Sequence, residues 1–174
     1  MHLVISGEGN SDIGRLTYIN NENIFDPAPM YYLIDKIIEE KYRYSHYQCG
    51  QENITFIPKS ELVDFCKQMK SFSGKKKNKE TALYFKNAQG LSKIAKEISK
   101  EIEDSDIKVI LFRDLDGTYT TSSDDYNNKI KSMEDAFKIE NINGVAMIPK
   151  PKSEAWLICA LKENKYQDCD KLED

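Results

Sequence analysis

The chain has 174 residues, of which 40% are hydrophobic and 31% are charged, and these values suit a single globular domain. Its net charge of −4 excludes a globally basic nucleic-acid-binding protein, so contacts to phosphates would require a local basic surface. Four Cys without a Cys-x-x-Cys pair, together with only two His, argue against a zinc site. The sequence starts with a strand pattern rather than a signal peptide, and no apolar run approaches the roughly 18 residues of a membrane span. We therefore expect a reduced, cytoplasmic protein.

The first third of the chain predicts two strands separated by a helix. Residues 2–6 are apolar and rich in β-branched side chains, which predicts a buried strand that ends at Gly7. A polar loop is expected over residues 20–29, followed by an amphipathic helix that starts near Pro29. Residues 54–57 predict a second strand, and Ser60 is expected to open a short helix.

Lysines dominate the next stretch, residues 67–79, which also contains a Ser-Gly pair. We expect a surface loop here, inserted into the domain at about residues 67–80. The loop includes Lys75, Lys76, Lys77 and Lys79. These side chains are either ordinary solvated charges or, if the loop flanks an active site, contacts for a phosphate backbone.

The remainder of the chain alternates helices and strands. A long helix is expected over residues 81–103 and a strand over residues 107–112. A helix capped by Ser122 or Ser123, a strand over residues 144–148 and a helix capped by Ser153 follow. This alternation predicts one α/β domain, residues 1–174, with a mainly parallel sheet flanked by helices.

Acidic residues follow two of the predicted strands. Glu8 and Asp12 come after the first strand, and Asp114 and Asp116 come after the strand at residues 107–112. Ligands bind at the carboxyl ends of the strands in open α/β sheets, and carboxylate oxygens are the ligands that Mg²⁺ prefers. If the two strands are neighbours, these four side chains converge on one or two divalent cations, and Glu8 could also act as general base for a water.

The same residues resemble a known family. Glu8-Gly9 after a first strand, Asp12 four residues later and Asp114-Leu115-Asp116-Gly117 after a later strand look like the Toprim domain. The Glu-x-x-x-Asp spacing is closest to that of primases and of nucleases of the overcoming-lysogenization-defect (OLD) family. The segment from Pro149 to Leu157, Pro-Lys-Pro-Lys-Ser-Glu-Ala-Trp-Leu, is similar to small stand-alone Toprim-like bacterial proteins. Those proteins often accompany a separate ABC/AAA-type ATPase in phage-defence operons.

The resemblance implies a Toprim-like Rossmannoid fold and a Mg²⁺- or Mn²⁺-dependent nuclease that cleaves DNA or RNA. It further implies an effector of a bacterial anti-phage defence or toxin-like system, with an ATPase as a possible partner. Carried over by position, Glu8 is a metal ligand or acid/base, and Asp114 and Asp116 are the metal-binding pair. The resemblance also makes Asp12 a second ligand. The resemblance also gives roles to three further residues: Glu154 is a third acidic position, and Lys150 and Lys152 are phosphate or transition-state partners.

Other interpretations of these residues stay open. Glu8 could be a solvated turn residue, Asp114 and Asp116 an Asp-Gly turn, and Asp12 the N-cap of a helix that starts at Ile13. Glu154 would interact favourably with a helix dipole even without a role in a site. Lys150 and Lys152 could be exposed loop charges. The whole chain could be a non-catalytic Toprim-fold adaptor for an ATPase. Less favoured is a haloacid-dehalogenase-like phosphatase, in which Asp114 of Asp-Leu-Asp-Gly-Thr would be the nucleophile.

Overall fold

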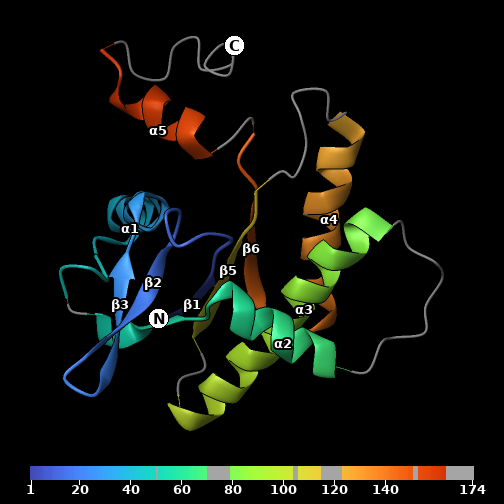
Figure 1. The fold of residues 1–174 in the computed structure, drawn as a ribbon, viewed down its shortest axis with the longest axis horizontal. Coiled ribbons are helices and arrows are strands. Elements are labelled where there is room, and N and C mark those ends of the chain that lie inside the picture. The colour runs from blue at the N-terminus through green and yellow to red at the C-terminus, as the bar shows by residue number, and fades with distance from the viewer. Residues whose placement is uncertain (50, 70–78, 104–105, 115–122, 151–152, 164–174) are drawn as a thin grey trace.

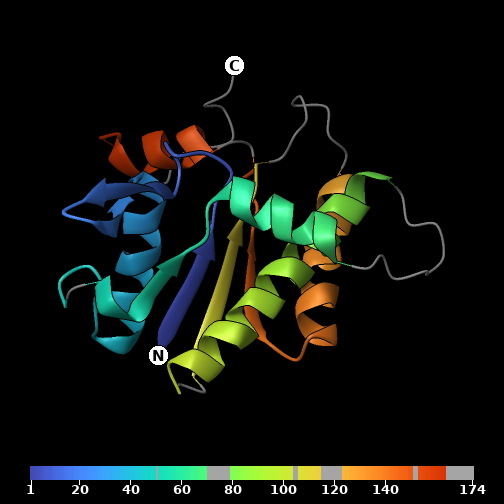
Figure 2. The same cartoon turned by 60° about the horizontal axis from the view of Figure 1, so that its bottom comes forward.

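The computed structural model describes residues 1–49, 51–69, 79–103, 106–114, 123–150 and 153–163. Its main sheet has four parallel strands in the order β4-β1-β5-β6. These are β1 (His2–Ser6), β4 (Ile54–Phe56), β5 (Ile107–Phe112) and β6 (Asn143–Met147). Helices lie on both faces of the sheet, as Figures 1 and 2 show. The predicted α/β class and the flanked parallel sheet are therefore confirmed.

Three helices cover one face of the sheet: α2 (Lys59–Gln68), α3 (Lys79–Glu101) and α4 (Ser123–Ile139). Their apolar stripes enclose a core with Val109 and Leu111 of β5. Successive side chains of a strand point to opposite faces, so Ile110 and Phe112 belong to the core on the other side. The boundaries expected from helical and strand spacing agree with these elements to within a few residues.

The other face carries α1 (Pro29–Tyr42), α5 (Ser153–Leu161) and a separate antiparallel hairpin. Trp156 of α5 is partly buried against this second core, and its Nε1 donates to the carbonyl oxygen of Lys150 at 3.0 Å. Phe25 of the hairpin contacts both the α1 ring of Tyr31 and the β4 ring of Phe56. Aromatic side chains therefore attach the hairpin and α1 to the sheet.

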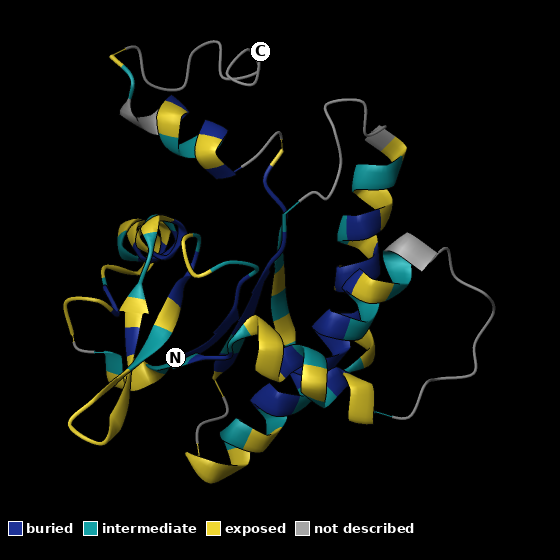
Figure 3. Cartoon of the chain, in the orientation of Figure 1, coloured by how far each residue is buried: buried dark blue, intermediate teal, exposed yellow. Residues whose placement is uncertain are grey.

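The hairpin corrects two predictions. It consists of β2 (Gly14–Ile19) and β3 (Glu22–Pro27), where the sequence predicted a polar loop over residues 20–29. Asn20 and Asn21 form its turn with φ of 51° and 69°, as expected for a two-residue turn of this kind. Because a strand and not a helix follows Asp12, the alternative of a helix N-cap at Asp12 is wrong. Figure 3 shows that the tip of the hairpin is exposed, whereas β1 and most of β5 are buried.

Several smaller features complete the fold. A short 3₁₀ helix (Gln51–Asn53) precedes β4. Cys66 is buried with a free thiol. Cys159 is also buried and is disulfide-bonded, whereas the sequence predicted a reduced protein. In the part of the chain that the structure describes, no helix is long and apolar enough to span a membrane.

Candidate functional site

Two acidic residues from distant parts of the chain meet at the carboxyl edge of the sheet. β1 and β5 pair in parallel with Ser6 opposite Leu111, and Glu8 and Asp114 each lie two residues past the end of their strand. The Oε2 atom of Glu8 accepts a hydrogen bond from the backbone N–H of Asp114 at 3.1 Å, across 106 residues of sequence. The predicted proximity of Glu8 and Asp114 is therefore present in the structure.

The position of this contact in the fold matters for its chemistry. From β1 the chain continues to β4 on one side of the sheet, whereas β5 continues to β6 on the other side. The strand order thus reverses between β1 and β5. In open α/β sheets the crevice at this reversal is where ligands bind. Glu8 and Asp114 flank that point.

The other carboxylate of the first cluster, Asp12, also lies at this edge. Its Oδ1 atom is 3.3 Å from the Oγ of Ser153, at the start of α5, and the same hydroxyl is 3.2 Å from Oε2 of Glu154. Since a hydroxyl carries one hydrogen, it donates fully to only one of the two acids at a time. Burial raises the pKa of Asp12, and the nearby Glu154 and Glu8 raise it further against the hydrogen bonds that lower it. Asp12, Glu154 and Glu8 therefore influence one another electrostatically.

Gly9 explains how the Asp12 side chain reaches this position. The backbone N–H of Asp12 donates to the carbonyl oxygen of Gly9 at 3.2 Å, which folds the chain tightly after β1. A Cβ atom at Gly9 would lie 2.8 Å from Oδ2 of Asp12. The glycine thus leaves room for the carboxylate against the backbone.

Lys59 is a member of the site that sequence reasoning missed. It is the first residue of α2, directly after β4, and its Nζ atom forms an ion pair with Oε1 of Glu8. The side chain of Lys59 is 48% exposed and that of Glu8 is 19% exposed, so solvent screens the pair in part. The signal available in the sequence was the position of Lys59 just past a strand, which is the kind of position that Lys150 and Lys152 occupy after β6.

Two further residues fix the end of β5. The hydroxyl of Tyr84 in α3 donates to the carbonyl oxygen of Asp114 at 3.0 Å. Arg113 is only 3% exposed, and one of its terminal nitrogens donates to the carbonyl oxygen of Phe112 at 2.8 Å. The backbone N–H of Arg113 donates to Met147 of β6 at 3.0 Å. The Asp114 backbone is therefore held from α3 and, one residue earlier, from β6.

The remaining predicted site residues are not brought to Glu8 by the described contacts. Lys150 is exposed, and its Nζ lies 5.2 Å from the ring centroid of Tyr126 in α4, which is a cation–π contact. Asp116, Lys152 and the loop residues Lys75, Lys76 and Lys77 lie outside the described residues. Lys79 is the first residue of α3, but its side chain also lies outside that description.

The resemblance implies Mg²⁺ or Mn²⁺ at this edge, and the donor chemistry fits these ions. Glu8, Asp12, Asp114 and Glu154 offer only hard carboxylate oxygens, with no thiolate or imidazole among them. Within the described residues, no three His, Cys, Asp or Glu side chains are grouped closely enough to hold a metal together. Glu8 and Asp114 would be the central ligands, with Asp12 and Glu154 in reach of the same edge.

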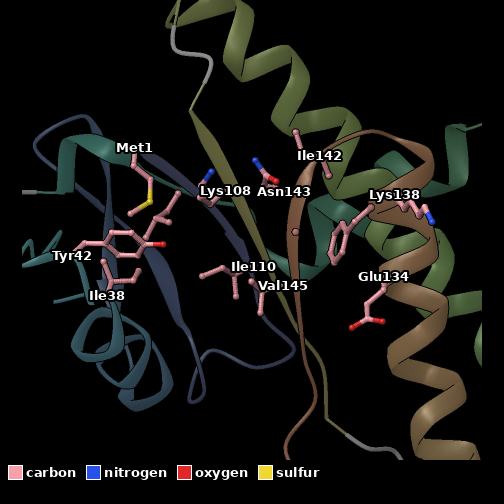
Figure 4. Close-up of a pocket in the computed structure, with 13 residues that line it drawn as sticks. Met1, Ile38, Tyr42, Lys108, Ile110, Glu134, Lys138, Ile142, Asn143 and Val145 are labelled. Atoms are coloured by element: carbon pink, nitrogen blue, oxygen red, sulfur yellow. The ribbon is translucent and has the colours of Figure 1, made fainter. Parts of the chain in front are cut away.

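A second hollow lies away from the acidic edge. It has a volume of about 490 Å³ and extends over the start of the strands between α1 and α4 (Figure 4). Ile38 and Tyr42 of α1, Ile110 of β5 and the half-exposed Val145 of β6 give it an apolar surface. Glu134 and Lys138 of α4 lie at its other side, as Figure 4 shows.

Comparisons with protein-family models, with curated proteins and with solved structures find no match to this chain.

Proposed function

We propose that this protein is a divalent-metal-dependent nuclease that hydrolyses phosphodiester bonds in DNA or RNA. The observation that carries the proposal is the contact of Glu8 with Asp114 at the point where the strand order reverses. A structural turn would not require two acidic residues from separate strands at the same edge. The nearby Asp12 and Glu154 add to the negative charge there, which favours a cation.

Each residue has a defined role in the proposed reaction. Glu8 and Asp114, with Asp116 by resemblance, would hold Mg²⁺ or Mn²⁺. The bound ion would activate water and neutralise charge that develops on the phosphate. Glu8 could accept the proton of the attacking water, since its carboxylate lies at the edge where substrate would bind. Lys150 or Lys152 would stabilise the transition state, as the resemblance implies.

The finer assignments rest on the resemblance alone. They are a role as cytoplasmic effector of an anti-phage defence or toxin-like system, and cooperation with an ABC/AAA-type ATPase. Lys75, Lys76, Lys77 and Lys79 would then guide the nucleic acid, because an acidic chain otherwise attracts phosphate backbones weakly.

A cleavage assay with a matched control tests the proposal. The wild-type protein is incubated with Mg²⁺ or Mn²⁺ and with single- and double-stranded DNA and RNA. We expect cleavage that Glu8→Ala and Asp114→Ala abolish, while Asp64→Ala on the exposed side of α2 leaves it intact. Full activity in either site variant would contradict the proposal. Hydrolysis of small phosphoesters without nucleic-acid cleavage would favour the haloacid-dehalogenase-like alternative.

A non-catalytic adaptor is the second candidate, and the apolar hollow between α1 and α4 favours it. Val145 is 55% exposed and Tyr42 is 55% exposed beside this hollow, which a partner protein could cover. Loss of binding to the ATPase after Val145→Asp, with no effect of Glu8→Ala in cells, would select the adaptor. Loss of cellular function after Glu8→Ala would select the nuclease.

A further inference from the structure

We infer that a small cavity beside Glu8, between α2 and α3, is a binding site for one phosphate group of the substrate. α2 and α3 pack against each other on the same face of the sheet (Figure 2). The cavity has a volume of about 130 Å³, and its polar lining consists of Glu8, Lys59, Asn87 and Arg113. The inference deepens the proposed function and rests on it for the identification of the phosphate as part of a nucleic acid.

The charges of the lining residues are the first reason to infer that an anion binds in this cavity. Lys59 and Arg113 carry two positive charges, and Glu8 carries the one negative charge among the described lining residues. Arg113 is nearly fully buried, so its charge is poorly screened by water. A metal ion bound by Glu8 would release Lys59 from its ion pair. Both cations would then face the cavity that adjoins the proposed metal ligands.

Asn87 gives the second, independent reason. It lies in α3, is only 4% exposed and lines the cavity. Its Oδ1 atom is buried and has no hydrogen-bond partner, which is costly for a polar group. Amide oxygen and nitrogen exchange places by rotation of the side chain, so Asn87 can present its NH₂ group to a bound oxygen. In that rotamer the NH₂ group of Asn87 would donate a hydrogen bond to a phosphate oxygen.

The size and the walls of the cavity limit the ligand. A volume of about 130 Å³ is several times the roughly 10–15 Å³ that a single water molecule requires. A phosphate group fits this space, whereas a whole nucleotide does not. Val63, Leu83 and Tyr84 form the rest of the wall. The N-terminus of α2 also lies at the cavity, because Lys59 is the first residue of this helix. The N-cap residue, Pro58, makes no side-chain capping hydrogen bond, so the N-terminus can favour an anion.

Titration with inorganic phosphate in metal-free buffer tests the site by calorimetry on the full chain. We expect wild-type binding that Lys59→Met weakens about tenfold, as for the loss of one charge-assisted hydrogen bond. Asn87→Ala should weaken it as well. Glu8→Gln should strengthen binding several-fold, because it removes the competing carboxylate and frees Lys59. Lys67→Met, at the exposed other end of α2, is the control and should bind as the wild type does.

The possible results separate this inference from the proposed function, because neither metal nor cleavage is needed. Equal phosphate binding in wild type and Lys59→Met, or no tighter binding in Glu8→Gln, would overturn the phosphate site even if the protein is a nuclease. Phosphate binding with the expected variant pattern would support the site even if no nucleic acid is cleaved. A short single-stranded oligonucleotide should displace phosphate. Failure to compete would overturn its assignment to a nucleic-acid strand in favour of free phosphate.

Discussion

Replacement of Glu8 by Gln distinguishes a functional carboxylate from a structural one. Gln retains an oxygen that can accept from the Asp114 N–H, so the main stabilising interaction lost is the ion pair with Lys59. Because the Lys59 side chain is 48% exposed, this pair contributes no more than about 1 kcal/mol. The expected decrease in Tm is about 2–4 °C for a domain of this size. Cleavage should nevertheless be lost completely.

Denaturant unfolding of wild type, Glu8→Gln, Lys59→Met and the double variant measures the coupling between the two side chains. A coupling energy below about 1 kcal/mol agrees with a screened pair. A loss of about 3 kcal/mol or more in Glu8→Gln is the size expected when a buried ion pair is broken. Such a loss would refute the reasoning and make Glu8 a structural residue.

Three further predictions concern stability. Gly144→Ala should destabilise the fold by about 1–3 kcal/mol in chemical unfolding, because its Cβ would lie 2.3 Å from the buried Phe137 ring; wild-type stability would contradict the packing of β6 against α4. Burial and neighbouring carboxylates raise the pKa of Asp12 above its ordinary 3.8. Asp12 therefore stabilises the folded state only at acid pH, and this stabilisation is lost as the pH rises through the raised pKa. Asp12→Asn should therefore raise Tm at pH 7 and lose this gain below about pH 3.8; an equal gain at both pH values would count against it. Burial raises the pKa of Glu140, but the Lys96 ammonium 2.8 Å away outweighs this effect and holds that pKa below its usual range. Glu140→Gln should therefore lower Tm at pH 7 and have little effect at strongly acid pH. A decrease in Tm that does not depend on pH would show that charge is not the cause.

Most elements of the fold follow from local patterns, and the hairpin shows where these patterns fail. Residues 107–112 are apolar apart from Lys108 because both faces of the sheet are covered. The hairpin strands are partly exposed and contain polar residues, so they lack this pattern. Asn20-Asn21 was the sequence signal for a two-residue turn, since Asn tolerates positive φ.

The proximity of Glu8 and Asp114 could be predicted because carboxyl ends of parallel strands meet at one edge. The sequence offers only the position of Lys59 just past a strand, and it offers no such signal for Asn87. Lys59 reaches Glu8 only because β4 lies beside β1, and Asn87 lines the cavity only because α3 packs beside α2. Both depend on which strands and helices are neighbours, and a single sequence does not state that order.

Manganese binding at the carboxyl edge tests the central claim most directly. Calorimetry of Mn²⁺ with the wild type should show binding, and Asp114→Asn should remove it. Asp64→Asn, a change of the same kind on the exposed face of α2, should leave it unchanged. Equal Mn²⁺ affinity in wild type and Asp114→Asn would contradict the assignment of a metal to Glu8 and Asp114.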